Sequence, residues 1–162
     1  MRAKSMAPKG TYLLILRLDT DLTGLAIGRL GRYDFAAGYY LYLGSAFGAG
    51  GLTARLAHHQ RAVKPHPHWH IDYLRACTHL IETWAVGSGM RKECCWTQGL
   101  AESPGLSFPV PSFGASDNSC VSHLLYSARR PALRLLTDTL LDSLARAGIE
   151  SFTLEITSYE GA

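Results

Sequence analysis

Long apolar runs are absent from this 162-residue sequence. No stretch approaches the ~18 consecutive apolar residues that a membrane-spanning helix needs, so no membrane partner is expected. The opening residues, MRAKSMAPKG, are basic, but no apolar segment follows them as it would in a secretory signal peptide. These absences favour a cytoplasmic location. We expect residues 1 to about 8 to be a short disordered N-terminus.

Cysteine is scarce, and its spacing excludes the common metal and redox motifs. The four cysteines are Cys77, Cys94, Cys95 and Cys120, and none of them forms a C-x-x-C pair. A chain without an export signal is expected to keep its thiols reduced. We therefore predict small apolar roles for these side chains rather than disulfide bonds.

Charged residues make up only 18% of the sequence, whereas hydrophobic residues make up 47%. This balance is typical of a folded domain and excludes a disordered chain. The formal net charge of +3 permits a nucleic-acid partner without requiring one. The length fits one domain with a substantial core, so we predict a single domain over residues 1–162. No obligate protein partner is evident.

Hydrophobic periodicity and breaker residues divide the chain into strands and helices. Strands are predicted over 10–18, within 25–35, and over 36–46, 79–87, 120–127 and 149–157. Helices are predicted over 52–63, 70–77, 89–100 and 130–148, and a turn over 19–24. This order predicts an α+β fold with a small central sheet, mixed or mostly antiparallel, flanked by helices.

Two short motifs place tyrosines at strand ends. GTY (10–12) opens the first strand, and YLG (42–44) closes the strand over 36–46. If these strands pair antiparallel, the start of one lies near the end of the other. Tyr12 and Tyr42 would then share one end of the sheet, next to a glycine-rich loop.

The helix after that loop carries Arg55 and His59, which lie one turn apart on the same face. A guanidinium binds phosphate oxygens through a fork of N–H donors. Histidine and tyrosine can orient or deprotonate a water molecule. Phosphodiester hydrolysis usually also needs a carboxylate for a divalent metal, and Glu93 is the candidate.

These motifs resemble the GIY-YIG nuclease superfamily, in which GTY and YLG occupy the two motif positions. Arg55 and His59 match the helix positions, and Glu93 matches the metal-binding glutamate. More closely, the sequence is similar to an uncharacterised prokaryotic branch that is sometimes fused to endonuclease III-like proteins. Patterns such as GYYLYLGSAFG, HWHIDYLR and FGASD carry that resemblance.

The resemblance implies a GIY-YIG-like fold and metal-dependent hydrolysis of nucleic acid, with DNA as the expected substrate and repair as the setting. It implies Mg²⁺ on Glu93, with Mn²⁺ as an alternative. It implies that Tyr12 hydrogen-bonds to, or deprotonates, the attacking water, and that Arg55 stabilises the negative charge on the phosphate. Tyr42 and His59 would position the water and the phosphate. Substrate-binding or supporting roles fall to Gly44, Ser45, His68, His70, Ser116, Asp117 and His123, and Asn118 is a candidate for the family's late asparagine.

Two other functions remain open. The chain could be a non-catalytic nucleic-acid-binding module of the same fold. It could instead bind zinc through His66, His68, His70 and Asp72, which alternate and would face one side of an extended segment. Trp69, within that run, is expected in the core. Five basic residues either line a phosphate track or are simply solvated: Arg29, Arg32, Arg61, Lys64 and Arg75.

Overall fold

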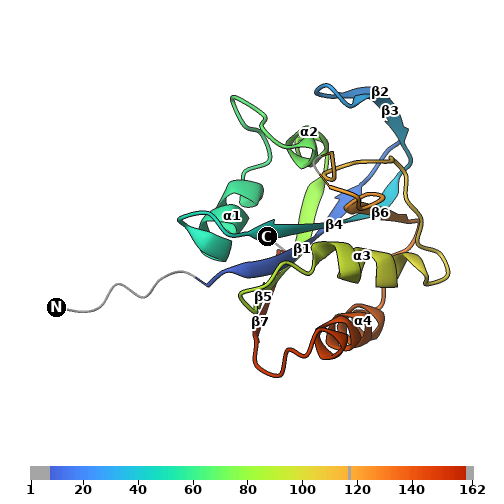
Figure 1. The fold of residues 1–162 in the computed structure, drawn as a ribbon. Coiled ribbons are helices and arrows are strands. Elements are labelled where there is room, and N and C mark those ends of the chain that lie inside the picture. Colours follow the sequence, from blue (N-terminus) through green and yellow to red (C-terminus); the bar gives the residue numbers. More distant parts are fainter. Residues whose placement is uncertain (1–7, 117, 160–162) are drawn as a thin grey trace.

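The structure, a computed structural model, describes residues 8–116 and 118–159. It has the predicted α+β fold (Figure 1). The strands are β1 (Gly10–Leu18), β2 (Leu22–Ile27), β3 (Gly31–Phe35), β4 (Gly38–Ala46), β5 (His79–Gly87), β6 (Leu124–Ser127) and β7 (Thr153–Ser158). The helices are α1 (Gly51–Gln60), α2 (His70–Arg75), α3 (Glu93–Ala101) and α4 (Leu133–Arg146).

The predicted N-terminal disorder lies outside the described residues, except at Pro8. The carbonyl of Pro8 accepts a hydrogen bond of 2.9 Å from the N–H of Leu52, at the start of α1. The described chain therefore begins attached to the helix that carries Arg55.

The main sheet has five strands in the order β6-β4-β1-β5-β7, and every neighbouring pair is antiparallel. The prediction left open whether the sheet is mixed or mostly antiparallel, and the structure makes it antiparallel. Strand β1 lies at its centre and is buried along almost its whole length.

Both faces of the sheet are covered, which follows from alternation along β1. Leu14 and Leu16 pack into the core beneath α1 and α2, whereas Leu13 and Ile15 pack beneath α3 and α4. Figure 1 shows these helix pairs on opposite sides of the sheet. Tyr12 falls in the even-numbered series, so its ring lies on the α1 side.

The region over 22–35 differs from the prediction. One short strand was predicted within 25–35, after a turn over 19–24, but β2 and β3 form a separate two-stranded hairpin. Gly24 has a φ of 65°, and the pairing register shifts between Leu22 and Leu25. This irregularity breaks the alternation that would have revealed β2.

Helix α3 begins at Glu93, four residues later than predicted. The buried hydroxyl of Thr11 holds the preceding loop: it accepts a hydrogen bond from the N–H of Lys92 at 2.9 Å and donates one to the carbonyl of Met90 at 3.3 Å. The first turn of α3 is thereby attached to the beginning of β1, and Glu93 comes to the same end of the sheet as Tyr12.

The prediction of reduced thiols is wrong for two of the four cysteines. Cys94 and Cys120 form a disulfide bond, whereas Cys77 and Cys95 are free and exposed. Residues 120–123 are not strand as predicted, because β6 begins at Leu124.

Within the part of the chain that the structure describes, no helix has the length and apolarity to cross a membrane.

Candidate active site

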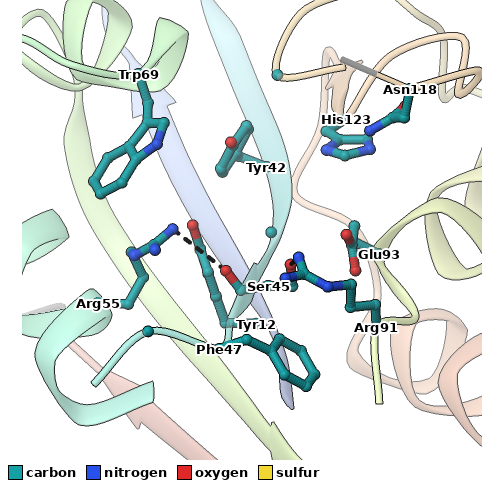
Figure 2. A pocket seen from close by; sticks show the side chains of 13 residues that line it. Tyr12, Tyr42, Ser45, Phe47, Arg55, Trp69, Arg91, Glu93, Asn118 and His123 are labelled. Atoms are coloured by element: carbon teal, nitrogen blue, oxygen red, sulfur yellow. Dashed lines mark hydrogen bonds between the residues drawn. The ribbon is translucent and has the colours of Figure 1, made fainter. Parts of the chain in front are cut away.

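A cavity of about 450 Å³ opens at the end of the sheet where β1 begins and β4 ends (Figure 2). Its lining includes eight of the residues predicted for the site: Tyr12, Tyr42, Gly44, Ser45, Arg55, Glu93, Asn118 and His123. It also includes Phe47, Gly48, Trp69, Arg91 and Gly114. The residues that line the cavity come from strands β1 and β4, helix α1, the segment before α2, the start of α3 and the loop before β6.

Tyr12 and Gly44 are direct cross-strand partners. The Tyr12 ring lies over Gly44 so closely that a Cβ at position 44 would stand 2.4 Å from both Cζ and Oη of the tyrosine. Glycine is therefore needed in the YLG motif for a steric reason: it makes room for the tyrosine of the GTY motif.

Tyr12 and His59 form a buried pair. The Tyr12 hydroxyl and Nε2 of His59 share a hydrogen bond of 2.9 Å. His59 is 0% exposed, so it supports Tyr12 from behind and does not line the cavity. Burial lowers the pKa of His59 to about 3, so the ring is neutral at physiological pH. Burial also raises the pKa of the Tyr12 phenol, although Arg55 lowers it in part.

Tyr42 is held by aromatic contacts. Its ring meets His59 and Phe113 edge-on, with centroid distances of 6.3 Å and 6.1 Å. Burial raises the pKa of its phenol well above the usual value. Both tyrosines in the cavity are therefore protonated at neutral pH and act there as hydrogen-bonding groups.

Arg55 approaches the cavity from α1 and lies over the ring of Trp69, with its Cζ 4.1 Å from the ring centroid. Its Nη1 donates a hydrogen bond of 3.3 Å to the carbonyl of Ser45 (Figure 2). No described carboxylate forms an ion pair with Arg55. The guanidinium is thus positioned by an indole and a carbonyl, and its charge remains available to an anion.

Glu93 contributes an unsatisfied carboxylate oxygen. Its Oε2 is buried and has no hydrogen-bond partner among the described residues, although the residue lines the cavity. A buried carboxylate oxygen without a partner is costly unless a cation or a donor reaches it. This residue therefore fits the divalent metal that the resemblance implies.

Asp72 is the centre of a different buried network. It accepts hydrogen bonds from Nε2 of His58 at 2.8 Å and from the N–H groups of His68 and Trp69 at 2.9 and 3.0 Å. Burial alone would raise the pKa of Asp72, but these hydrogen bonds outweigh it and bring the pKa to about 2. The network fixes Trp69, and through it the position of Arg55.

His58, His59 and Asp72 form the one metal-like group of three among the described residues, with ligand atoms within 4.8 Å of one another. The Nζ atom of Lys64 lies 3.5 Å from the Asp72 carboxylate, where its ammonium group opposes a second cation. Asp72 already has a full set of donors, so this cluster serves the fold.

The alternating histidines do not assemble as a zinc site would require. His66 and His68 are exposed, whereas Asp72 is buried. The Nδ1 atom of His70 accepts a hydrogen bond of 2.9 Å from the N–H of Gly114. His70 therefore supports the loop that lines the cavity. Trp69, expected in the core, is only partly buried and forms part of the cavity wall.

The remaining predicted residues have mixed positions. Ser116 is exposed and is not part of the cavity lining, whereas Asp117 lies outside the described residues. Two of the five basic residues neither line a phosphate track nor face solvent. Lys64 is buried against Asp72, and buried Arg75 donates hydrogen bonds to the carbonyls of His59, Gln60 and Thr78.

Sequence reasoning missed Phe47 and Arg91 in the cavity. The signal for Phe47 was its place in the glycine-rich loop, directly between two predicted elements of the site. Arg91 had a weaker signal, since it stands two residues before Glu93 in a segment predicted to be helical. Neither residue type is unusual at a surface, so only their convergence identifies them.

The family model described as a domain of unknown function, DUF123, matches residues 11–146. The chain therefore belongs to this family. The matched region contains every described residue that lines the cavity. Comparisons with curated proteins and with solved structures gave no match.

Proposed function

We propose that this protein is a metal-dependent phosphodiesterase that cleaves nucleic acid, an endonuclease with DNA as its expected substrate. One observation carries the proposal: Tyr12, Tyr42, Arg55 and Glu93 line a single cavity, where the arginine makes no ion pair with a described carboxylate and a glutamate oxygen has no described partner. A cation-binding group and an anion-binding group in one polar cavity suit a phosphate held beside a metal ion.

In this proposal Arg55 binds the scissile phosphate. The negative charge that develops on the phosphate oxygens needs donors that are already in position. Stacking on Trp69 and the hydrogen bond to Ser45 hold the guanidinium in place. An arginine fixed in this way loses little side-chain entropy when it contacts the phosphate.

Tyr12 positions the attacking water. Because its pKa is raised, the hydroxyl keeps its proton at neutral pH and acts as a hydrogen-bonding partner rather than a ready base. His59 fixes the orientation of that hydroxyl through the 2.9 Å hydrogen bond. A divalent ion held by Glu93 would supply charge neutralisation at the phosphate.

Supporting residues come from the loop before β6. His123 and Asn118 line the cavity opposite Arg55 in Figure 2, and the loop is held to α3 by the Cys94–Cys120 disulfide.

A cytoplasmic location belongs to the proposal as well. The disulfide is the observation that weighs against it, since such bonds are uncommon in reducing compartments.

The test is cleavage of labelled duplex, flap, single-stranded and abasic DNA by the pure protein with Mg²⁺, Mn²⁺ or EDTA. We expect metal-dependent cleavage that falls by about 10²–10³-fold in Arg55→Ala and is lost in Glu93→Gln. Tyr12→Phe is expected to be strongly impaired. Glu102→Gln, which changes an exposed glutamate at the other end of α3, should retain the activity of the unaltered protein.

Binding without cleavage under every metal condition would overturn the catalytic proposal. The chain would then be a nucleic-acid-binding module of the same fold. Cleavage that persists in Glu93→Gln would remove the proposed metal ligand.

A further inference from the structure

The cavity contains a second arginine to which the proposed function gives no role. The side chain of Arg91 is exposed and lines the cavity. Its Cζ lies 4.5 Å from the centroid of the Phe47 ring, and its Nη1 donates a hydrogen bond of 2.8 Å to Oγ of Ser45. An aromatic face and a hydroxyl therefore position this exposed side chain.

The backbone around Arg91 is also fixed. The Thr11 hydroxyl bonds to the residues on both sides of it, the carbonyl of Met90 and the N–H of Lys92. Thr11 is fully buried at the start of the central strand. Contacts of the side chain and of the neighbouring backbone therefore both fix the position of Arg91 at the cavity.

The two arginines resemble each other in their surroundings. Each is stacked on an aromatic ring, and each donates a hydrogen bond to Ser45, one to its carbonyl and the other to its hydroxyl. Figure 2 shows them on the two sides of Ser45.

No described carboxylate forms an ion pair with either arginine. Several other arginines of the described chain do have such partners: Arg17, Arg130, Arg134 and Arg146. Two guanidinium groups held near one residue repel each other, and a negatively charged group bound at each of them relieves the repulsion.

We infer that Arg91 binds a second phosphate, adjacent to the phosphate that Arg55 holds. The substrate is then a nucleic-acid strand with at least two successive phosphates, and a lone phosphodiester is a poor substrate. This inference rests on the proposed function for placing the scissile phosphate at Arg55. Whether Arg91 binds a phosphate can be tested by binding measurements alone, without any cleavage.

The first experiment measures binding of a short fluorescein-labelled single strand, and of its duplex, by fluorescence anisotropy in EDTA over a range of NaCl concentrations. Arg91→Ala should weaken binding about tenfold at low salt. It should also reduce the slope of log K against log[salt] by about 0.7 for the single strand and about 0.9 for the duplex, as expected for one lost phosphate contact.

Arg134→Ala is the matched control, because it removes an equal charge from the exposed surface of α4. It should leave both the affinity and the slope unchanged. Arg91→Lys should keep the slope but bind less tightly, since lysine keeps the charge and loses the planar fork. An Arg91→Ala slope equal to that of Arg134→Ala, or no binding by the unaltered protein, overturns the inference.

The second experiment replaces single phosphates next to the cleaved bond by uncharged methylphosphonates. The unaltered protein should lose affinity at one neighbouring position, and Arg91→Ala should be insensitive there, because the same contact is already missing. Equal sensitivity of both proteins at every position overturns the inference.

The two proposals fail separately. Arg91-dependent binding without cleavage by any metal would leave the second phosphate site standing and remove the nuclease. Cleavage of bis(p-nitrophenyl) phosphate as efficient as cleavage of the oligonucleotide, with no effect of Arg91→Ala on either, would leave the phosphodiesterase standing and remove the second site.

Discussion

Among single residues, Gly44 gives the sharpest steric prediction. A methyl group at this position would lie 2.4 Å from Cζ and Oη of the Tyr12 ring, which is itself buried and backed by His59. The ring cannot move away without breaking its hydrogen bond to His59. We expect Gly44→Ala to lower the free energy of unfolding by about 2 kcal/mol, as measured by urea denaturation.

Gly48→Ala is the control for this prediction. Gly48 lines the same cavity, but an added Cβ would meet no atom within 4 Å. Its effect should stay within about 0.5 kcal/mol. Equal stability of Gly44→Ala and Gly48→Ala would contradict the close packing of Tyr12 on Gly44.

His59 predicts a particular pH dependence of stability. Its pKa is about 3 in the folded protein and near 6.5 in the unfolded chain, so the unfolded state binds the extra proton between these values. Stability is therefore fully present above pH ~6.5 and is lost as the pH falls toward 3, at about 1.4 kcal/mol per pH unit.

The measurement is urea denaturation of the unaltered protein and of His59→Gln between pH 4.5 and 6.5. The variant carries no titrating group at this position, so its stability should depend on pH less steeply by about that slope. His66→Gln, which replaces an exposed histidine, controls for the loss of an imidazole. Parallel pH curves for all three proteins would rule out the buried neutral state of His59.

Some site residues could be predicted from the sequence because their signal is local. Tyr12 and Tyr42 stand at strand ends, and Arg55 and His59 lie one helical turn apart. Trp69 and Arg91 could not be assigned in this way. Their place in the cavity depends on contacts with Arg55 and Phe47, which are distant in sequence and meet only after the sheet and helices pack.

Among the elements, helix α1 depends on a residue of α2. The buried guanidinium of Arg75 donates to the carbonyls of His59 and Gln60 at 2.8 and 3.1 Å, at the end of α1. It also donates to the carbonyl of Thr78 at 2.7 Å. The last carbonyls of a helix have no partner within the helix, so Arg75 supplies donors that they would otherwise lack.

We expect Arg75→Met to lower the free energy of unfolding by about 3 kcal/mol, because it leaves buried carbonyls without donors. Arg75→Lys should recover only part of the loss, since an ammonium lacks the planar fork. Circular dichroism in urea measures both effects. Arg61→Met is the exposed control, and a loss of the same size there would contradict this role for Arg75.

The elements that sequence patterns predicted well are those with regular periodicity. Strands β1, β4 and β5 combine buried runs with clear turns, and α4 has an amphipathic repeat that ends before Gly148. The β2–β3 hairpin was missed because Gly24 and the register shift interrupt its alternation. The start of α3 was misplaced because the Thr11 hydroxyl, more than seventy residues away, holds the preceding loop.

At the scale of the whole molecule, the Cys94–Cys120 disulfide links two parts of the site. Cys94 follows Glu93 in the first turn of α3, and Cys120 lies in the loop that contributes Asn118 and His123 to the cavity. No sequence pattern signals this pairing, because the cysteines are 26 residues apart and become neighbours only through the packing of α3 against the loop.

Closing a loop of this length restricts the unfolded chain, which stabilises the fold by about 3.5 kcal/mol in the chain-entropy account. We expect a variant with both Cys94→Ser and Cys120→Ser to unfold at lower urea concentration by a corresponding amount. Reductant should destabilise the unaltered protein but leave this variant unchanged.

A variant with both Cys77→Ser and Cys95→Ser keeps the bond, so it should behave like the unaltered protein, including its sensitivity to reductant. Because the bond holds the loop against the start of α3, its loss should also weaken the metal-dependent cleavage that we propose. If reductant changed neither stability nor cleavage of the unaltered protein, the disulfide would have no part in holding the site together.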